Sequence, residues 1–396
     1  MTSADGRSLR VLHVAQPTTA GVAAVVAQYV SSLMDSSRES RRRFTVAVAC
    51  PTDGHLHTDI VTAGAEHLPW SANRSPGVGV LGESRDLART VRRWRPDVIH
   101  LHSAKAGLAG RLAVRERIPT VYQPHAWSFQ AARGVTAAAA VRWERAANRW
   151  TTLTVNVGGH ERRVGEVQGI AGPFHLVSNR VDVAEWGPDD RGEARRLLDM
   201  PTDVAVAVCV ARLCEQKGQD RLVAIWDRVR AAVPGALLYL VGPDQGDSNL
   251  PRPLPEGVVH VGAAVPRRWY AAADAVVMAS RWEGLPMVAL EAEAAGRVVV
   301  ATEEAGASGF LDPVDEVAGT DLDALASRVI HRLADRGESA RVGELARLRA
   351  EKRPGLRLLS VELGELYDRA MRPEYSPGIW ESRRHTDPPL QNPLSG

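Results

Sequence analysis

Two glutamates, Glu283 and Glu291, flank a stretch of the sequence that predicts the start of a helix. Pro286 suits a first helical turn, because its missing N–H would have no partner there, and Gly296 suits the left-handed residue that ends a helix. The free N–H groups at a helix start favour phosphate. Carboxylates on both sides of a phosphate site suit a ligand with hydroxyl groups at both ends and phosphate in the middle. A nucleotide-sugar has this layout, although two such glutamates are also typical of a solvated helix face.

A second segment with phosphate chemistry lies upstream. Arg212 and Lys217 lie between an apolar, strand-like run at Val204–Val210 and a helical pattern at Asp220–Val233. A strand-to-helix loop would bring both cations onto one diphosphate, arginine through its planar pair of donors and lysine as a point charge. Because such a pair of charges is also common in solvated loops, a nucleotide-sugar site is predicted only from the two segments together.

Together these segments resemble the retaining glycosyltransferases of family 4. The family's hallmarks are a strand ending in G-R-L-x-x-x-K-G and a later E-G-x-P-x-x-x-x-E. This chain has A-R-L-C-E-Q-K-G at 211–218 and E-G-L-P-M-V-A-L-E at 283–291. Three further segments are similar to family landmarks in the same order, and the resemblance covers residues 9–371. These segments are Asp97–His102, Pro124–Trp127 and Tyr270–Asp274.

The resemblance implies an α/β protein of the GT-B fold, with two Rossmann-like, doubly wound parallel-sheet domains facing a central cleft. The alternation of strand-like and helical runs indicates the same class. We place an N-terminal, acceptor-side domain at 1–180 and a C-terminal, nucleotide-sugar-binding domain at 181–358. In the family, the helix expected at 359–371 returns to the N-terminal domain. Residues 372–396 are rich in Pro, Ser and charge and predict a disordered tail.

Apolar runs with β-type composition predict the strands of both sheets, and the polar segment Asn179–Pro188 marks the junction between the sheets. The expected strands are Arg10–Ala15, Phe44–Cys50, Val98–Leu101, Thr120–Gln123, Leu153–Val157, Phe174–Val177, Val204–Val210, Ala236–Val241, Val258–Val261, Ala275–Ala279 and Arg297–Ala301. Helical patterns include Val22–Met34, Glu83–Trp94 and Leu358–Met371.

The resemblance also assigns roles by position. His125, Arg212, Lys217 and Glu283 are expected to be catalytic. His125 contacts the donor sugar and the developing positive charge, and Glu283 holds sugar hydroxyls. His125 as an ordinary loop histidine is the alternative. The expected donor-binding residues are Gly21, Arg212, Lys217, Gly242, Val261, Gly284, Leu285, Pro286, Met287 and Glu291, with Glu291 on the ribose hydroxyls.

The implied reaction retains the configuration at the anomeric carbon. A retaining glycosidase needs two carboxyl groups about 5 Å apart, and the family offers no clear nucleophile in such a position. The usual proposal is therefore a front-face reaction, in which the leaving diphosphate helps to deprotonate the incoming hydroxyl. Arg212, Lys217 and the helix start near Pro286–Val288 would stabilise the growing negative charge. No metal and no cofactor are expected besides the nucleoside-diphosphate sugar, which is a co-substrate.

Several positions depart from the family pattern. Gly21 alone remains of a usual glycine pair, and Arg180 replaces a glycine in N-G-V-D. Glu293 and Arg297 stand where the family prefers Met and Pro, and Ala305–Gly309 lacks the glutamate of G-G-x-P-E. These departures leave fine donor selectivity open.

The net charge of +2 is distributed unevenly. Residues 1–180 carry 23 Lys and Arg against 13 Asp and Glu, whereas residues 181–396 carry 26 against 34. A basic acceptor domain favours an anionic membrane surface or a lipid-phosphate acceptor. Solvated helix faces in an arginine-rich chain are the other interpretation. The basic clusters are Arg41–Arg43, Arg92–Arg95 and Arg111–Arg117.

The acceptor is less determined than the donor. His102–Gly107 and Pro124–Phe129 are similar to the branch that acts on polysaccharide or lipid-linked intermediates, which favours a UDP-sugar and a polyprenyl-phosphate-linked acceptor. The chain has only three lysines, a bias expected of a GC-rich bacterial genome. Because such bacteria also decorate natural products with these enzymes, a soluble small-molecule acceptor stays open. Nucleic acid is not an expected partner.

Several features bear on localisation and on other functional classes. The sequence contains no run of 18 or more apolar residues, so no membrane-spanning helix is predicted, and the first residues are polar. The three cysteines form no spaced pattern and fit a reducing cytosol. We therefore expect a cytoplasmic protein, which would lie at the inner face of the membrane if it contacts lipid. Gly77–Gly82 fits G-x-G-x-x-G, but it follows no strand, which argues against a nicotinamide site. A sugar-nucleotide epimerase and a non-catalytic GT-B module remain alternatives to a transferase.

Overall fold

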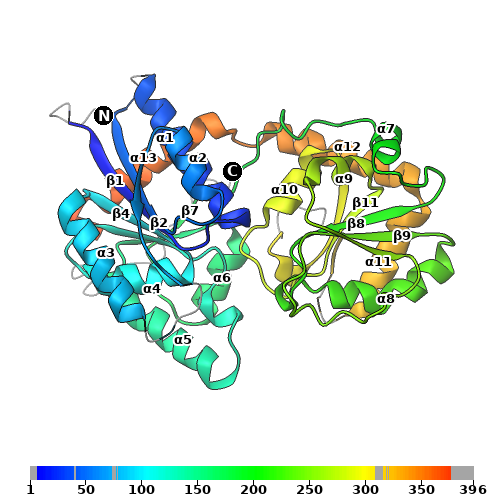
Figure 1. Ribbon diagram of the computed structural model, residues 1–396, viewed down its shortest axis with the longest axis horizontal. Coiled ribbons are helices and arrows are strands. Elements are labelled where there is room, and N and C mark those ends of the chain that lie inside the picture. Colours follow the sequence, from blue (N-terminus) through cyan, green and yellow to red (C-terminus); the bar gives the residue numbers. More distant parts are fainter. Residues whose placement is uncertain are drawn as a thin grey trace.

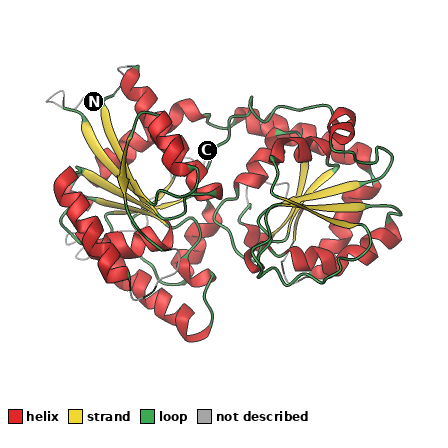
Figure 2. Cartoon of the chain, in the orientation of Figure 1, coloured by secondary structure: helices red, strands yellow, loops and turns green. Residues whose placement is uncertain are grey.

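Two parallel sheets, one in each half of the chain, form the frame of the computed structural model (Figures 1 and 2). The structure describes residues 7–39, 42–73, 77, 79–307, 315–317, 319 and 321–375. The first sheet has seven strands in the order β3-β2-β1-β4-β5-β6-β7, and the second has six in the order β10-β9-β8-β11-β12-β13. The predicted α/β fold of two doubly wound sheets is confirmed. We refer to each sheet with its helices as the first lobe and the second lobe.

The strands are short, and those inside each sheet are largely buried, as expected for parallel sheets covered on both faces, whereas the edge strands β3, β7 and β10 are half-buried or exposed for most of their length. In the first lobe they are β1 Leu9–Ala15, β2 Phe44–Cys50, β3 Glu66–Pro69, β4 Val98–His102, β5 Thr120–Gln123, β6 Leu153–Asn156 and β7 Phe174–Leu176. In the second lobe they are β8 Val206–Val210, β9 Leu237–Val241, β10 Val258–Gly262, β11 Ala275–Met278, β12 Val298–Thr302 and β13 Glu316–Val317.

Helices cover both faces of each sheet (Figure 2). The first lobe has α1 Ala20–Arg38, α2 Leu56–Thr62, α3 Val80–Trp94, α4 Ser103–Val114, α5 Gly134–Ala147 and α6 Gly159–Val167. The second lobe has α7 Arg191–Leu197, α8 Gln219–Ala232, α9 Pro266–Ala272, α10 Met287–Ala294, α11 Leu322–Ala334 and α12 Arg336–Lys352. Each lobe therefore has one apolar core on either side of its sheet.

The last long helix, α13 (Leu359–Ala370), lies in the first lobe although it follows α12 of the second (Figure 1). Its buried face, which includes Leu363 and Tyr367, belongs to the core that α1 and β1 share. Arg42 donates two hydrogen bonds to Asp368, of 2.7 and 2.6 Å. The chain thus crosses between the lobes twice, and α13 fastens the second crossing.

The structure differs from the sequence expectations at a few places. Strands β3 and β13 were not predicted, because four and two residues carry too little periodicity. Pro286 has an extended backbone and precedes α10, so it does not lie in the first turn as expected. Gly296 does have the left-handed conformation, with a φ of 69°.

Some expectations fall on undescribed positions. Residues 376–396 of the expected tail, Ser308 and Gly309 of the departing segment, and Val78 of the G-x-G-x-x-G match lie outside the described residues. Among the residues that are described, no helix combines the length and apolar character needed to cross a bilayer.

Candidate functional site

Each sheet reverses its strand order at one point, between β1 and β4 in the first lobe and between β8 and β11 in the second. Open parallel sheets bind ligands beyond the carboxyl ends of the strands at such a point. Gly21 follows β1, Arg212 follows β8 and Glu283 follows β11. The expected site residues therefore come from both of these points.

The two phosphate-type segments of the second lobe lie directly against each other. The backbone N–H of Arg281 donates to the Gln216 carbonyl (2.8 Å), and the Gln216 side chain donates to the Trp282 carbonyl (3.1 Å). The Arg281 guanidinium donates to the Glu215 carbonyl (2.7 Å) and, through both terminal nitrogens, to Asp220 (2.9 and 2.6 Å). Arg281 thus fixes the register in which Lys217 meets Glu283.

Lys217 and Glu283 form an ion pair at the centre of this contact. The Ser280 hydroxyl donates to the same Glu283 oxygen (3.1 Å), and both charged side chains are largely buried. Gly218 follows the lysine with a φ of 65°, and a Cβ there would lie 2.0 Å from the Ala279 carbonyl oxygen. Only glycine therefore allows the loop to approach β11 closely enough for the pair to form.

Arg212 is the cation of this site without a charged partner. Its guanidinium donates to the Gln245 side-chain oxygen (2.5 Å), and among the described residues no carboxylate pairs with it. Its backbone carbonyl accepts a hydrogen bond from the buried Gln219 side chain (2.9 Å). The loop holds the backbone of Arg212 firmly while its charge stays available for an anion.

Gly242 and Val261, expected near the nucleotide base, lie at the carboxyl ends of β9 and β10. The Gly242 N–H donates to the Gly262 carbonyl (2.7 Å), and a Cβ on Gly242 would lie 2.1 Å from the Ala211 carbonyl oxygen. The glycine therefore lets this strand end pack against the residue preceding Arg212. Val261 is half-buried beside it.

The loop after Glu283 reaches the first lobe. A Cβ on Gly284 would lie 2.8 Å from Cγ2 of Val157 and 3.2 Å from the backbone nitrogen of Ala126. A larger residue would force the lobes apart, so Gly284 marks a position of close approach. His125 immediately precedes Ala126, which brings the expected catalytic histidine next to this loop.

Two further contacts join the same loop to the first lobe. The Asn179 side chain donates to the Leu285 carbonyl (2.6 Å). A Cβ on Gly21 would lie 3.8 Å from Cγ of Met287, at the start of α10. The structure thus brings Gly21, Leu285 and Met287 together from both lobes.

The backbone at His125 is strained. His125 and Ala126 have φ values of 53° and 87°, which cost non-glycine residues about 1–3 kcal/mol each. Glu161 at the start of α6 holds this conformation, because its carboxylate accepts from the N–H groups of Ala126 (2.6 Å) and Val157 (2.8 Å). Sequence reasoning missed Glu161, which carries no motif and is recognised only by these contacts.

Burial sets the charge state of His125. Its Nε2 atom lies 3.1 Å from Nδ1 of His102, and burial lowers the pKa of His125 to about 3. The imidazole is therefore neutral at physiological pH and offers one donor and one acceptor. A neutral ring can contact a sugar hydroxyl or a developing positive charge without repelling it.

Glu291 lies in the first turns of α10 and accepts a hydrogen bond from the Tyr270 hydroxyl (2.8 Å). Burial raises the pKa of Glu291 to about 7, and the nearby Glu185 raises it further, against the opposite effect of the Tyr270 hydrogen bond. A ligand that donates hydrogen bonds to this carboxylate would favour its ionised form and lower its pKa.

The departures from the family pattern have structural partners. Arg180 pairs with Glu362 of α13. Glu293 pairs with Arg353 and lies 3.6 Å from Arg349. These side chains therefore fasten α12 and α13.

Arg297, which also departs from the family pattern, has local partners as well. Arg297 donates to the Tyr270 carbonyl (2.9 Å) and the Ala271 carbonyl (2.8 Å), so it holds the end of α9.

Two family models match the chain. "Glycosyltransferase Family 4" matches residues 21–185, and "Glycosyl transferases group 1" matches residues 205–335. The first covers most of the first lobe and the second most of the second lobe.

Curated relatives agree with these matches. A GDP-mannose-dependent alpha-mannosyltransferase of Mycobacterium tuberculosis is 30% identical over 263 residues, which is 62% of this chain and 68% of that enzyme. A GDP-mannose-dependent monoacylated alpha-(1-6)-phosphatidylinositol monomannoside mannosyltransferase of Corynebacterium glutamicum is 31% identical over 208 residues, which is 48% of this chain. The match spans 55% of the Corynebacterium enzyme, about half its length.

Solved structures share the fold. Anabaena HepE, in complex with UDP and glucose, superposes with a TM-score of 0.74 at 18% identity, covering 91% of this chain and 99% of HepE. Sucrose-phosphate synthase from Thermosynechococcus elongatus gives the same TM-score and identity and covers 91% and 98% of the two chains.

Proposed function

This chain belongs to glycosyltransferase family 4, and on that premise we propose that it is a retaining glycosyltransferase. It moves a sugar from a nucleoside-diphosphate donor to a hydroxyl of a lipid-linked saccharide or an envelope polysaccharide precursor. The observation that carries the proposal is the junction of three segments. The Arg212–Lys217 loop, the Glu283–Met287 loop and the strained His125–Ala126 turn adjoin where the lobes meet.

The donor diphosphate binds between Arg212 and the first turn of α10. Arg212 has no carboxylate partner among the residues the structure describes, and the start of α10 offers free N–H groups. When the donor binds, the Lys217 ammonium group contacts the phosphate in place of part of its contact with Glu283. The Glu283 oxygen that is released then accepts hydrogen bonds from the sugar hydroxyls. The Lys217–Glu283 pair therefore holds both side chains in place until the donor arrives.

The reaction follows from these positions. As the bond from the anomeric carbon to the diphosphate breaks, negative charge grows on the phosphate, and Arg212, Lys217 and the start of α10 stabilise it. The incoming hydroxyl oxygen forms the new bond to the anomeric carbon on the face that the phosphate leaves, and its proton passes to the leaving phosphate oxygen, so the configuration is retained. Neutral His125 lies beside the sugar. Two cations and a helix start supply the positive charge, so the mechanism assigns no role to a metal.

The sugar donor carries uracil or guanine. The sequence favours a UDP-sugar, and the solved HepE structures contain UDP. Two relatives are GDP-mannose-dependent mannosyltransferases instead. Gly242 and Val261 border the base in either case, and the binding experiment below distinguishes the two bases.

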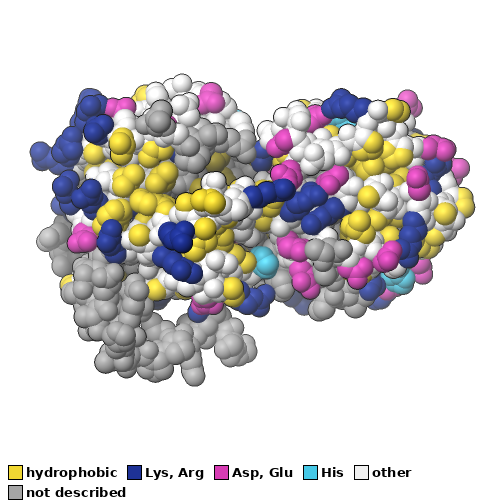
Figure 3. Space-filling view, turned by 90° about the horizontal axis from the view of Figure 1, so that it is seen from below, with side chains coloured by type: hydrophobic (Ala, Val, Ile, Leu, Met, Phe, Trp, Pro, Cys, Tyr) yellow, Lys and Arg dark blue, Asp and Glu magenta, His cyan; other side chains and the backbone are white. Residues whose placement is uncertain are grey.

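A lipid-linked acceptor agrees with the charge of the first lobe. Between α3 and α4 lies a pocket of about 300 Å³ whose lining includes Arg92, Arg95 and Arg117 beside Val91 and Ile118. None of the three guanidinium groups pairs with a carboxylate in the part of the chain described here. In Figure 3, basic side chains gather at the outer, left-hand end of this lobe. We propose that this surface meets anionic lipid at the cytoplasmic face of the membrane.

The test is a thermal-shift panel of UDP-, GDP-, ADP- and dTDP-sugars on the purified protein. A ligand at about 100 times its Kd adds about 2.7 kcal/mol of stability. We expect one nucleotide class to stabilise the protein and Lys217→Ala and Glu291→Ala to abolish the shift. Lys352→Ala, at an exposed position at the end of α12, is the matched control and keeps the shift.

Product analysis with the stabilising donor then separates the enzyme classes. Slow donor hydrolysis, with release of free sugar of retained configuration, agrees with a transferase. A changed sugar still attached to the nucleotide identifies an epimerase. No stabilisation of a folded protein by any nucleotide-sugar contradicts the assigned donor site.

A further inference from the structure

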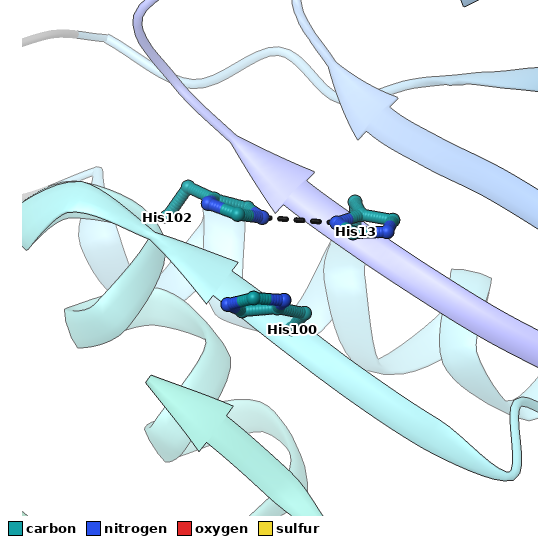
Figure 4. A group of neighbouring side chains, drawn as sticks. All are labelled: His13, His100 and His102. Carbon is teal, nitrogen blue, oxygen red and sulfur yellow. Dashed lines mark hydrogen bonds between the residues drawn. The ribbon is translucent and has the colours of Figure 1, made fainter. Parts of the chain in front are cut away.

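Three histidines from neighbouring strands form a buried group beneath the site. His13 lies on β1, and His100 and His102 lie on β4, with His13 opposite His100 in the register of the two strands. All three side chains are fully buried. Figure 4 shows the ring of His13 joined to that of His102 by a hydrogen bond, with His100 beneath.

The group is arranged for hydrogen bonding and not for a metal ion, although its ligand atoms lie within 4.8 Å of one another. The rings of His100 and His102 are stacked, with centroids 4.1 Å apart and planes inclined by 29°. An imidazole binds metal through a lone pair in its own plane at about 2.0–2.1 Å. Two stacked rings cannot aim such lone pairs at one ion.

The hydrogen bonds continue in both directions and make a chain. Nδ1 of His13 lies 2.9 Å from Nε2 of His102, and Nδ1 of His102 lies 3.1 Å from Nε2 of His125. At the other end, the Tyr367 hydroxyl of α13 lies 3.5 Å from Nε2 of His13 and 3.1 Å from Nδ1 of His100. The chain therefore links α13 to His125.

Every ring in the chain is neutral. Burial lowers the pKa of His13 to about 3 and the pKa values of His100 and His102 well below the ordinary value. A neutral imidazole has one N–H and one nitrogen lone pair, so a ring that accepts a hydrogen bond at one nitrogen must donate from the other. One fixed end therefore decides the tautomer of every ring.

Gln123 of β5 fixes that end. Its amide nitrogen donates to the Tyr29 hydroxyl (3.1 Å), which leaves its oxygen as an acceptor. Burial is the largest effect on the pKa of His100 and lowers it, whereas Gln123 acts on the ring as an acceptor and raises the pKa, because an acceptor favours the protonated ring. Neither the Gln123 oxygen nor Nε2 of His100 has a partner within ordinary hydrogen-bond distance among the described residues, so each of these buried atoms is available to the other.

The direction then follows ring by ring. With Nε2 of His100 assigned as the donor to the Gln123 oxygen, the Tyr367 hydroxyl donates to Nδ1 of His100, and His13 donates from Nε2 to the Tyr367 oxygen. His102 then donates from Nε2 to His13, and His125 donates from Nε2 to His102. The last free atom of the chain is Nδ1 of His125, which carries a lone pair.

We propose that this buried chain from Gln123 to His125 fixes His125 in the Nε2-protonated tautomer, so that its Nδ1 accepts a hydrogen bond from a hydroxyl of the bound donor sugar. His102, His13 and Tyr367 are then positioning residues. The last clause of the proposal rests on the proposed function, whereas the tautomer is a property of the protein alone.

The tautomer can be measured without any ligand. Protein labelled with ¹⁵N-histidine gives long-range ¹H–¹⁵N spectra in which a protonated and an unprotonated ring nitrogen differ clearly, and His125→Gln identifies the signals of His125. We expect His125 to be protonated at Nε2 alone. In Tyr367→Phe, which keeps the ring but removes the bridging hydroxyl, we expect both tautomers of His125.

Activity gives the second readout. Tyr367→Phe should lower kcat about two- to tenfold at nearly unchanged KM for the donor, the range of one lost hydrogen bond. His102→Leu should lower kcat further, and His102→Gln, which retains a donor and an acceptor, should restore part of it. Tyr239→Phe, on β9 of the other lobe, is the control and leaves kcat and the His125 signals unchanged.

The outcomes are distinct. A His125 protonated at Nδ1, or a His125 tautomer that Tyr367→Phe and His102→Leu leave unchanged in folded protein, overturns the proposal. The expected tautomer in a protein that binds no nucleotide-sugar upholds the chain and contradicts the proposed function instead.

Discussion

At the scale of single residues, burial decides which charges are available at the site. The histidines beneath it are kept neutral, whereas Glu291 has a pKa of about 7 because its carboxyl group is buried beside Tyr270. Relative to its ordinary value of 4.5, the folded protein holds this proton more tightly than the unfolded chain. The resulting stability is complete below about pH 4.5 and is lost as the pH rises toward 7.

This raised pKa predicts pH-dependent donor binding. In the function proposed above, an ionised Glu291 would accept hydrogen bonds from the ribose hydroxyls, so a donor would bind the ionised form and release the proton. We expect the affinity for the nucleotide-sugar to rise about tenfold from pH 6 to pH 8 and then to level off, as for one ionisation near pH 7. Isothermal titration calorimetry at several pH values measures this affinity.

Glu291→Gln is the control for this prediction, because the amide has no proton to lose and should bind with an affinity independent of pH. The intact nucleotide-sugar is the ligand to use, since a free nucleoside diphosphate has its own ionisation near pH 6. A slope that persists in Glu291→Gln would assign the ionisation to another group.

At the scale of elements, Asp274 connects several segments of the second lobe. Its buried carboxylate accepts hydrogen bonds from Arg195 of α7 (2.8 Å), Arg191 (2.6 Å) and Arg336 of α12 (3.2 Å), and from the Val206 N–H of β8 (2.8 Å). The family landmark Tyr270–Asp274 thus has a structural role at its last residue.

Asp274→Asn should therefore destabilise the protein strongly. The substitution leaves the buried Arg195 without its counter-charge, and breaking such a pair costs about 3–5 kcal/mol. Asp189→Asn is the matched control, because Asp189 pairs with Arg267 at an exposed position, where a pair contributes at most about 1 kcal/mol. Thermal and urea unfolding compare the two. Equal, small shifts would contradict this account of Asp274.

At the scale of the whole molecule, charge is divided between the halves of the chain. The first 180 residues have a net charge of +10 and the remainder −8. The basic pocket between α3 and α4 lies on the positive half. If this face meets the membrane, binding should depend on anionic lipid and weaken with added salt.

Vesicle sedimentation tests this prediction. Each arginine near an anionic surface contributes about 1 kcal/mol, so Arg92→Glu with Arg117→Glu should weaken binding at least roughly 30-fold. Arg196→Glu with Arg268→Glu makes the same change of charge at exposed positions of the second lobe and should have little effect. Equal loss in both variants would indicate a net-charge effect, and binding to neutral vesicles would contradict the proposal.

The architecture and the phosphate-type loops could be predicted from the sequence. Alternating apolar runs predict two doubly wound sheets because a buried parallel strand needs continuous apolar residues. Local signals also mark the Arg212–Lys217 and Glu283–Gly284 segments, since a glycine or a cation beside a strand end is visible in a short window. Strands β3 and β13 were too short to give such a signal.

How these segments meet could not be predicted and depends on the three-dimensional fold. The Lys217–Glu283 pair, the approach of Gly284 to Ala126 and the support of His125 by Glu161 join residues far apart in the chain. The histidine chain is a further example, because β1, β4, β5 and α13 each supply part of it. Hydrogen bonds and burial act over a few ångströms in space, whereas a sequence pattern records only neighbours along the chain.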